Sequence, residues 1–169
     1  MVVIRLGRAE DLASLQRIER LAGAPFRGLG MDAIADDPSL SVEHLTRNQR
    51  ADRVWVAQHG SALVAYLILD VVADAAHIEQ VSVDPSYSRR RIGQRLIDTA
   101  ADWARVHGLR SLTLTTFERV PWNAPYYERL GFAVLHEDEQ TRELRAIRDL
   151  ERAAGLDPWP RVAMIRPLD

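Results

Sequence analysis

The sequence contains no cysteine and no lysine among its 169 residues. Without cysteine, the chain can form no disulfide, no thiolate metal site and no cysteine nucleophile. Without lysine, it can form no Schiff base on a lysine side chain, and all 22 basic residues are arginine. Covalent catalysis through a thiol or a lysine amine is therefore excluded.

The sequence also lacks long apolar runs and a strong excess of charge. No run reaches the ~18 apolar residues that a membrane span needs, and the start, Met1–Arg5, has no secretory pattern. Twenty-two basic and 24 acidic residues give a net charge of −2, whereas a general nucleic-acid binder is usually basic. We expect a single domain over residues 1–169 that is cytoplasmic and binds neither nucleic acid nor membrane.

The hydrophobic pattern predicts alternating helices and strands. The predicted strands are Val2–Leu6, Val54–Gln58, Ala62–Val72, His77–Val83, Leu112–Phe117, Phe132–Leu135 and Val162–Arg166. The predicted helices are Ala9–Ala22, Ser41–Arg50, Arg90–His107, Ala124–Leu130 and Thr141–Ala154, with a turn and a short helix between Gly23 and Pro38. Hairpins combined with a strand–helix–strand crossover indicate an α/β fold, with a mixed sheet and helices on both faces.

Two of these helices show clear apolar stripes. In Arg90–His107 the predicted buried side consists of Ile92, Leu96, Ile97, Ala100, Ala101 and Ala104. In Thr141–Ala154 the predicted stripe consists of Leu144, Ile147 and Leu150.

The segment from His77 to Leu96 reads as a strand, a polar loop and the start of a long helix. A helix N-terminus has unpaired backbone N–H groups and a partial positive charge, so it suits phosphate. Arg89, Arg90 and Arg91 add positive charge there, which is unfavourable beside the helix dipole unless an anion binds. On physical grounds alone, an anion site and a solvated arginine cluster remain about equally good interpretations.

The same segment resembles the acetyl-CoA-binding motif of the GNAT superfamily of N-acetyltransferases, of a bacterial type. In that family a strand is followed by Arg/Gln-x-x-Gly-x-Gly/Ala and a long helix. Val81-Ser82-Val83 matches the strand end and Gly93 matches the last glycine, whereas Ser88 replaces the Arg/Gln and Arg91 replaces the first glycine. We expect Arg91 to be tolerated if its φ is negative.

A second segment resembles another signature of the family. Asn123-Ala124-Pro125-Tyr126-Tyr127-Glu128-Arg129-Leu130-Gly131-Phe132 is similar to its Asn…Phe/Tyr-Tyr-Glu-x-Leu-Gly-Phe pattern. It follows the long helix by one predicted strand, where the family has it. The order of elements also follows the family over nearly the whole chain.

The resemblance implies a mostly antiparallel central sheet of about six or seven strands, with a cleft where the fourth and fifth strands splay apart. It implies acetyl-CoA as cosubstrate and no metal. The implied cofactor-binding residues are Val81, Ser82 and Val83 along the pantetheine arm, Ser88, Arg89, Arg90, Arg91, Ile92, Gly93 and Gln94 around the pyrophosphate, and Asn123 and Tyr127 near the thioester.

The chemistry needs a base for the attacking amine and an acid for the departing thiolate. His77 and Glu79 are the candidate bases, since their spacing of two places both side chains on one face of the strand. Glu79 is the first choice, although His77 has a pKa nearer neutrality. The family position of Tyr127 makes it the candidate acid.

Two further regions could shape the acceptor site. Phe26 and Met31 lie in the segment that forms the acceptor-side wall in the family. Pro121 and Trp122 form a rigid loop beside the expected acceptor site and shape the pocket, or Trp122 simply belongs to the core.

The sequence therefore predicts an acetyl-CoA-dependent N-acetyltransferase that uses direct transfer in a ternary complex. The alternative is a non-catalytic CoA-binding or acyl-CoA-binding module of the same fold. The predicted partner is an amine-bearing acceptor, either a small molecule or a protein N-terminus. Because dimers are common in the family, a homodimer also remains open.

Overall fold

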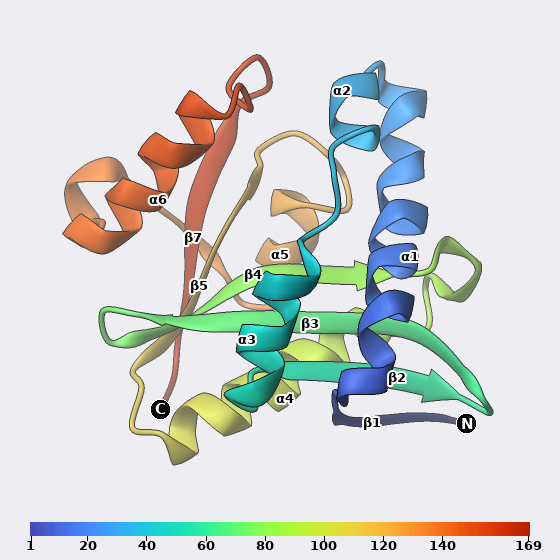
Figure 1. The fold of residues 1–169 in the computed structure, drawn as a ribbon. Helices are drawn as coiled ribbons and strands as arrows, with labels where there is room; N and C mark the ends of the chain where they lie inside the picture. Colours follow the sequence, from blue (N-terminus) through green and yellow to red (C-terminus); the bar gives the residue numbers. More distant parts are fainter. The chain divides into compact units, whose positions relative to one another are not determined.

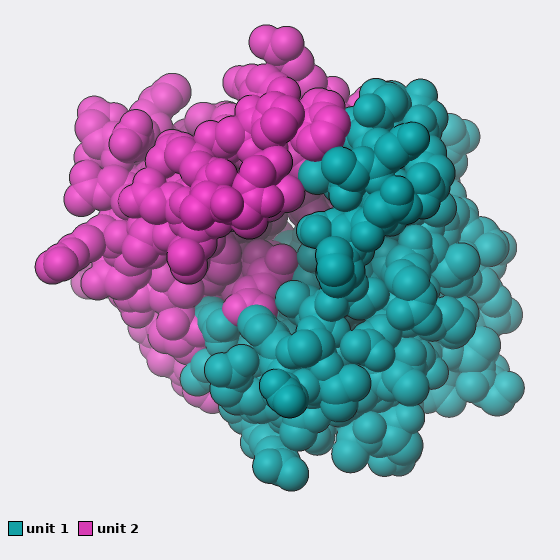
Figure 2. All heavy atoms as spheres, turned by 45° about the horizontal axis from the view of Figure 1, so that its top comes forward, with its two compact units in different colours: residues 1–70, 80–99 teal, residues 71–79, 100–169 magenta.

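The computed structural model describes residues 1–169 and divides the chain into two compact units. Unit 1 contains residues 1–70 and 80–99, and unit 2 contains residues 71–79 and 100–169 (Figure 2). Seven strands follow the hydrogen-bonding order β1-β2-β3-β4-β5-β7-β6. This is the mixed, mostly antiparallel sheet that the sequence predicts. The two units are described in turn.

Unit 1 is built on an antiparallel meander. β1 (Val2–Leu6) pairs with β2 (Val54–His59), and β2 pairs with β3 (Ala62–Val72) (Figure 1). The predicted hairpin turn is confirmed, because Gly60 adopts a φ of 61° between β2 and β3, a conformation that favours glycine.

A bulge in β3 sets which side chains reach the core. Ala57 pairs with Ala65 and Gln58 pairs with Leu63, so Val64 is an extra residue between them. One extra residue reverses the alternation of side chains along a strand. Leu63 therefore joins Tyr66 on the core face although the two lie three residues apart.

Two helices cover that face. α1 (Leu12–Gly23) and α3 (Val42–Arg50) lie in front of β2 and β3 in Figure 1. The buried cluster is made of Leu12, Leu15 and Ile18 of α1, Leu45 of α3, Val54 and Val56 of β2, and Leu63, Tyr66 and Ile68 of β3. Burial of these side chains, each contributing roughly 1.5–3 kcal/mol, is the main stabilisation of this part of unit 1.

Short turns and caps connect the helices of unit 1. The 3-10 turn η1 (Ala9–Asp11) precedes α1, while η2 (Ala24–Leu29) and α2 (Asp32–Ala35) follow it. The Asp11 carboxylate accepts hydrogen bonds from the Arg5 guanidinium at 2.8 and 3.1 Å and from the Arg8 backbone N–H at 2.7 Å. Ser41 caps α3 by accepting a hydrogen bond from the His44 backbone N–H at 3.1 Å.

β4 (Ala75–Val83), η3 (Pro85–Tyr87) and α4 (Ile92–Val106) form the predicted strand–loop–helix segment. The predicted buried side of the long helix is confirmed, since its members are all buried: Ile92, Leu96, Ile97, Ala100, Ala101 and Ala104. α4 ends before Gly108, whose φ of 71° stops the helix.

Unit 2 is built on β5 (Ser111–Phe117), which pairs antiparallel with β7 (Arg161–Pro167). β6 (Ala133–Leu135) pairs with the other edge of β7. β4 runs parallel to β5, but the ladder between them covers only Ala75–His77 and Ser111–Thr113. α5 (Ala124–Arg129) and the turn η4 (Glu137–Glu139) complete the connections, together with α6.

α6 (Arg142–Ala153) differs from its predicted packing. Leu144 is buried and Ile147 is half-buried, but Leu150 is 71% exposed. The buried position in its place is Arg148, whose side chain hydrogen-bonds the Glu151 carboxylate at 2.8 Å. The helix is therefore turned so that an ion pair, and not Leu150, faces the interior, and the predicted leucine stripe is wrong at its last member.

Most predicted elements are confirmed, and Val2–Leu6 and Ala62–Val72 have the predicted bounds. The helices are shorter at their starts, because Ser41 and Thr141 are caps and residues 90–91 precede α4. No helix of the structure is both long and apolar enough to cross a bilayer.

The packing of α6 predicts unequal effects for the same substitution at two of its leucines. Leu144→Ala should lower the free energy of unfolding by about 2–4 kcal/mol, because it empties a buried site. Leu150→Ala should change it by less than about 0.5 kcal/mol, because the side chain is exposed. Urea denaturation of the two variants measures the difference, and equal losses would contradict this placement of the helix.

Candidate functional site

The loop that precedes α4 is held by its own hydrogen bonds. The Asp84 carboxylate accepts from the Ser86 backbone N–H at 2.9 Å and from the Ser86 hydroxyl at 2.7 Å. The Tyr87 N–H donates to the Asp84 carbonyl at 2.8 Å. These bonds form the η3 turn and fix where the chain leaves β4, so the start of α4 has a defined position relative to the end of β4 in unit 1.

Two arginines of this loop adopt left-handed backbone conformations. Arg89 has a φ of 62° and Arg91 a φ of 59°. The condition of a negative φ, under which a side chain at position 91 is expected to be tolerated, is therefore not met. Position 91 is where the related motif carries its first glycine, and the left-handed conformation explains that preference, since a side chain there costs roughly 1–2 kcal/mol. This chain has arginine in that conformation and accepts the strain.

The left-handed turn leads directly into a helix start that carries backbone donors. α4 begins at Ile92, so the N–H groups of its first turn have no acceptor within the helix. The Arg95 N–H donates to the Arg91 carbonyl at 3.0 Å and marks the first closed helical turn. Gly93 is buried and presents no side chain. The segment from Arg89 to Gln94 thus offers several backbone donors, with three exposed arginines beside them.

An aromatic side chain stabilises one of these arginines. The Arg90 guanidinium lies 4.8 Å above the ring of Tyr87, a cation–π distance. The Tyr87 hydroxyl in turn lies 3.2 Å from Nδ1 of His59. Sequence reasoning missed Tyr87, although an aromatic residue three positions before an arginine in a polar loop is a usable signal.

Within unit 1, the end of β4 carries the three residues assigned to the pantetheine arm. Ser82 is buried and its hydroxyl accepts a hydrogen bond from the Gln80 side chain at 2.9 Å, whereas Val81 and Val83 are half-buried. The Asp84 N–H donates to the Val64 carbonyl at 2.8 Å. The bulge residue of β3 therefore anchors the point where β4 ends.

The candidate bases lie in unit 2, on the earlier part of β4. His77 is 4% exposed, and its Nδ1 lies 3.0 Å from the Thr113 hydroxyl of β5. Glu79, two residues further along, is half-buried. Thr113 is a second residue that sequence reasoning missed, because a threonine in a Leu/Thr-rich strand gives no signal until the strand register is known.

His77 also marks where β4 and β5 stop pairing. Its register partner Thr113 is the last residue of the parallel ladder, while β4 continues to Val83 and β5 continues to Phe117. The part of β4 that follows His77 therefore lies outside the ladder with β5.

Tyr127 lies on α5 in an aromatic setting. It is 8% exposed, and its ring packs edge-on against Tyr126 at 5.3 Å and against Phe132 at 5.8 Å between ring centroids. Burial raises the pKa of Tyr127 above its ordinary value, and the neighbouring Tyr126 adds to this. The Asn123 carbonyl accepts a hydrogen bond from the Tyr127 N–H at 3.0 Å, so the two predicted residues lie together at the start of α5.

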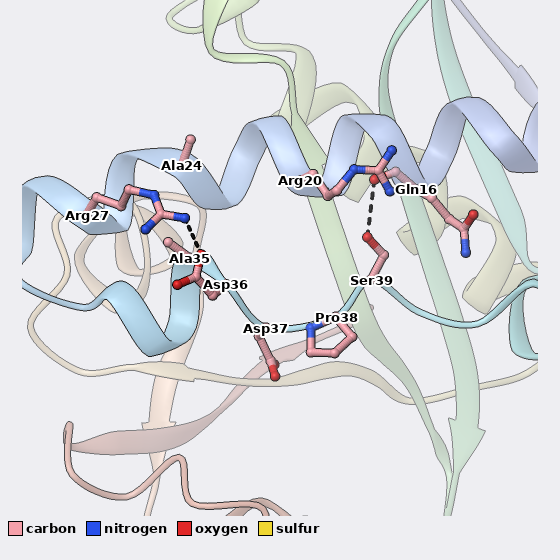
Figure 3. Close-up of a pocket in the computed structure, with 9 residues that line it drawn as sticks. All are labelled: Gln16, Arg20, Ala24, Arg27, Ala35, Asp36, Asp37, Pro38 and Ser39. Carbon is pink, nitrogen blue, oxygen red and sulfur yellow. Dashed lines mark hydrogen bonds and ion pairs between the residues drawn. The ribbon is translucent and has the colours of Figure 1, made fainter.

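A cavity lies elsewhere in unit 1, away from the predicted site residues. It measures about 500 Å³ and is lined by α1, η2, α2 and the segment 36–39, with Arg20 and Asp37 on opposite walls (Figure 3). It contains none of the predicted site residues. Phe26 is half-buried and Met31 is buried, so Met31 belongs to the interior and does not form an open wall.

The loop after β5 remains accessible. Trp122 is 38% exposed and Pro121 is exposed. The interpretation of Trp122 as a core residue is therefore wrong, while a role beside an acceptor remains a prediction.

Comparison with known proteins gives a family match. Residues 15–132, more than half of the chain, match the family described as the Acetyltransferase (GNAT) family. The matched region includes all of the predicted catalytic and cofactor-binding residues. A glucosamine 6-phosphate N-acetyltransferase of Trypanosoma brucei brucei is 37% identical over 68 residues, which cover 40% of this chain and 44% of that enzyme. The alignment thus spans under half the length of that relative.

Solved structures show the same fold. The N-acetylglutamate synthase of Neisseria gonorrhoeae, complexed with coenzyme A and N-acetyl-glutamate, has a TM-score of 0.74 and 21% identity, covering 100% of this chain and 35% of that chain. The PaiA N-acetyltransferase of Thermoplasma acidophilum, in complex with coenzyme A, has a TM-score of 0.71 and 18% identity over 99% of each chain. The ribosomal-protein-S18-alanine N-acetyltransferase of Escherichia coli has a TM-score of 0.67 and 21% identity, covering 100% of this chain and 95% of that chain.

The left-handed backbone at Arg91 predicts a position-specific penalty for a β-branched residue. Arg91→Val should lower the free energy of unfolding by about 1–2 kcal/mol more than Arg90→Val, because a β-branched residue tolerates a positive φ poorly. Arg91→Gly should be about as stable as the wild type, since relief of strain offsets the flexibility of glycine. Chemical denaturation checks all three variants, and equal losses for the two valine variants would disprove the strain.

Proposed function

The chain belongs to the acetyltransferase (GNAT) family, and we propose that it transfers the acetyl group of acetyl-CoA to an amine by direct attack. The observation that carries this proposal is the segment from Asp84 to Gly93, where a left-handed turn leads into a helix start inside the matched region. We further take residues 1–169 to act as one N-acetyltransferase domain.

The residues of unit 1 suit the binding of coenzyme A. The backbone N–H groups from Arg89 to Gln94 are donors for the pyrophosphate, and the arginine side chains add positive charge. Ser88 leads into this turn with an extended backbone. The backbone of Val81, Ser82 and Val83 lies on the part of β4 beyond its ladder with β5, so an extended pantetheine arm can hydrogen-bond there as a strand does. These observations fit acetyl-CoA as the cosubstrate.

The attacking amine needs a base. At pH 7 an amine with a pKa of ~10.4 is neutral in a small fraction of molecules, a cost of roughly 4–5 kcal/mol. Glu79 is the proposed base, because it is half-buried and so reachable by substrate or a bridging water. His77 is buried and bonded through Nδ1 to Thr113, which suits a residue that passes a proton or orients Glu79.

The departing thiolate needs an acid, and Tyr127 is the proposed donor. Burial and the neighbouring Tyr126 hold the pKa of Tyr127 above its ordinary value, so the hydroxyl keeps its proton at neutral pH. Asn123, directly before α5, is proposed to contact the cofactor arm. Since the chain has no cysteine, no thiol-bound acyl-enzyme can form, and transfer proceeds in a ternary complex.

The acceptor is an amine, borne either by a small molecule or by a protein N-terminus. Two similar proteins are named for acceptors of these two kinds. One is named for glucosamine 6-phosphate, and the other for an alanine of ribosomal protein S18. We place the reaction in the cytoplasm, in a bacterial cell, and leave a homodimer as one possible assembly. The second candidate function is a CoA-binding module without turnover, which the arginine in place of glycine at position 91 favours.

The first test of the proposal is thermal unfolding with and without saturating acetyl-CoA, with ATP as a phosphate control. Ligand at about 100-fold above its Kd adds about 2.7 kcal/mol of stability, which for this chain length raises Tm by roughly 5–10 °C. A rise with acetyl-CoA and little change with ATP is expected. If neither ligand raises Tm, both the transferase and the CoA-binding module are excluded.

The second test separates an enzyme from a binding module. Tyr127→Phe should lower kcat by about 100-fold, because it removes the proton donor while keeping the aromatic packing. The affinity for acetyl-CoA should stay within about twofold. Tyr126→Phe on the same helix is the matched control and should keep kcat within a few fold. Similar rates for Tyr127→Phe and the wild type would remove Tyr127 from the chemistry.

A further inference from the structure

A buried charged group in unit 2 has no role in the mechanism above. It joins Glu151 and Arg148 of α6, Thr115 of β5 and Arg161 of β7. The side chains of Arg148 and Arg161 are each 9% exposed, and that of Glu151 is 15% exposed. Two cations and one carboxylate are therefore nearly enclosed at one place.

The Glu151 carboxylate accepts hydrogen bonds from three neighbouring side chains. Its carboxylate accepts hydrogen bonds from Arg148 at 2.8 Å, from Arg161 at 2.9 Å and from the Thr115 hydroxyl at 2.5 Å. Burial raises the pKa of the Glu151 carboxyl. The charge of Arg161 and these hydrogen bonds together lower the pKa by more than burial raises it, so the pKa of Glu151 lies below its ordinary value. The group stays an anion at neutral pH and neutralises one of the two arginines.

Arg161 keeps an unused donor. Its side chain bonds to Glu151 and Thr115 through one terminal nitrogen, while its buried Nε has no hydrogen-bond partner. The guanidinium lies 4.5 Å above the ring of Phe117, which fixes its plane. Asp157 lies 3.7 Å from Arg148 and 3.3 Å from Arg152, and it is 42% exposed. The carboxylate of Asp157 therefore pairs with Arg148 and Arg152 and not with Arg161.

The register of β5 places this group near the candidate base. Thr113 contacts His77, and Thr115 contacts Glu151 and Arg161. Residues two apart on a strand point to the same face and lie roughly 6.6 Å apart. Phe117 and Arg161 are register partners across β5 and β7, so their side chains share this face. One face of β5 thus carries a polar row from the histidine to the buried arginine.

We propose that Arg161 is the specificity residue for an acceptor that carries an anionic group, a carboxylate or a phosphate, one short spacer away from its amine. The inference rests on the proposed transferase function. A planar guanidinium with a free N–H recognises either oxyanion through directed hydrogen bonds. An acceptor along this face has its amine toward Glu79 and His77, the proposed proton-transfer pair, and its anion toward Arg161, as in an amino acid or an aminoalkyl phosphate.

The test compares matched acceptors that differ in the anionic group. L-tyrosine is compared with tyramine, L-histidine with histamine, and O-phosphoethanolamine with ethanolamine. Release of CoA is followed with a thiol reagent, which cannot react with this cysteine-free chain. At least one anionic member should exceed its neutral partner at least tenfold in kcat/KM. Equal or lower values for every anionic member overturn the proposal, and the three pairs separate carboxylate from phosphate.

Substitution of Arg161 tests the residue itself. Arg161→Gln should reduce the preference for the anionic member to near twofold, mainly by raising KM, with the affinity for acetyl-CoA unchanged. The variant should fold, because Glu151 keeps its bonds to Arg148 and Thr115. Arg161→Lys keeps the charge beside Glu151 and should also lose most of the preference, since it lacks the planar fork. Arg145→Gln, an exposed substitution on α6, is the control and should keep the preference.

An equilibrium measurement decides the question if no pair is acetylated. With CoA saturating the pyrophosphate site, inorganic phosphate should raise the Tm of the wild type above that in sodium chloride of equal ionic strength. Arg161→Gln should abolish this rise, and an equal effect of phosphate on both proteins overturns the anion site. Failure of acetyl-CoA itself to raise Tm overturns the transferase proposal instead, so the two failures are distinguishable.

Discussion

The ladder between β4 and β5 ends at the pair His77 and Thr113, and the chemistry that we propose depends on that point. Up to it, β4 has a strand on the β5 side, and His77 is buried and hydrogen-bonded to Thr113. Beyond it, Glu79, Val81 and Val83 are half-buried and lie outside the ladder that joins β4 to β5. Burial along this face of β4 thus decreases from His77 onward, and the roles proposed for its side chains change in the same order.

The start of α4 shows a related compromise between backbone and charge. Arg89 and Arg91 take left-handed conformations that glycine adopts without strain. Their side chains also put positive charge beside the positive end of the helix dipole. Neither feature favours the folded state by itself, and strain of this kind persists where the surrounding structure requires it. An anion bound at this loop offsets the unfavourable charge of the arginines beside the helix dipole. The left-handed turn then precedes backbone N–H groups that can bind this anion.

The sequence predicted the elements well because hydrophobic periodicity decides them. The buried side of α4 was predicted completely, since small and branched apolar residues recur there at helical spacing. Three features escaped prediction for tertiary reasons. The φ of Arg91 is set by the turn that this residue completes. The exposure of Leu150 is set by the ion pair of Arg148 and Glu151, which takes the interior side of α6. The bulge at Val64 is set by the pairing of β3 with β2. The two motif segments located the candidate site residues, but Thr113 and Arg161 became visible only with the strand register.

The buried charges beneath α6 are not explained by stability. Replacing a buried ion group by apolar residues of similar volume is often neutral or stabilising, and the unpartnered Nε of Arg161 adds a further cost. Leu150, on the same helix, is exposed although it could fill an interior position. A helix that turns Leu150 to solvent and Arg148 inward gains charge beside Arg161 of β7. That gain has value where a ligand carries the opposite charge, which links the orientation of α6 to the choice of acceptor.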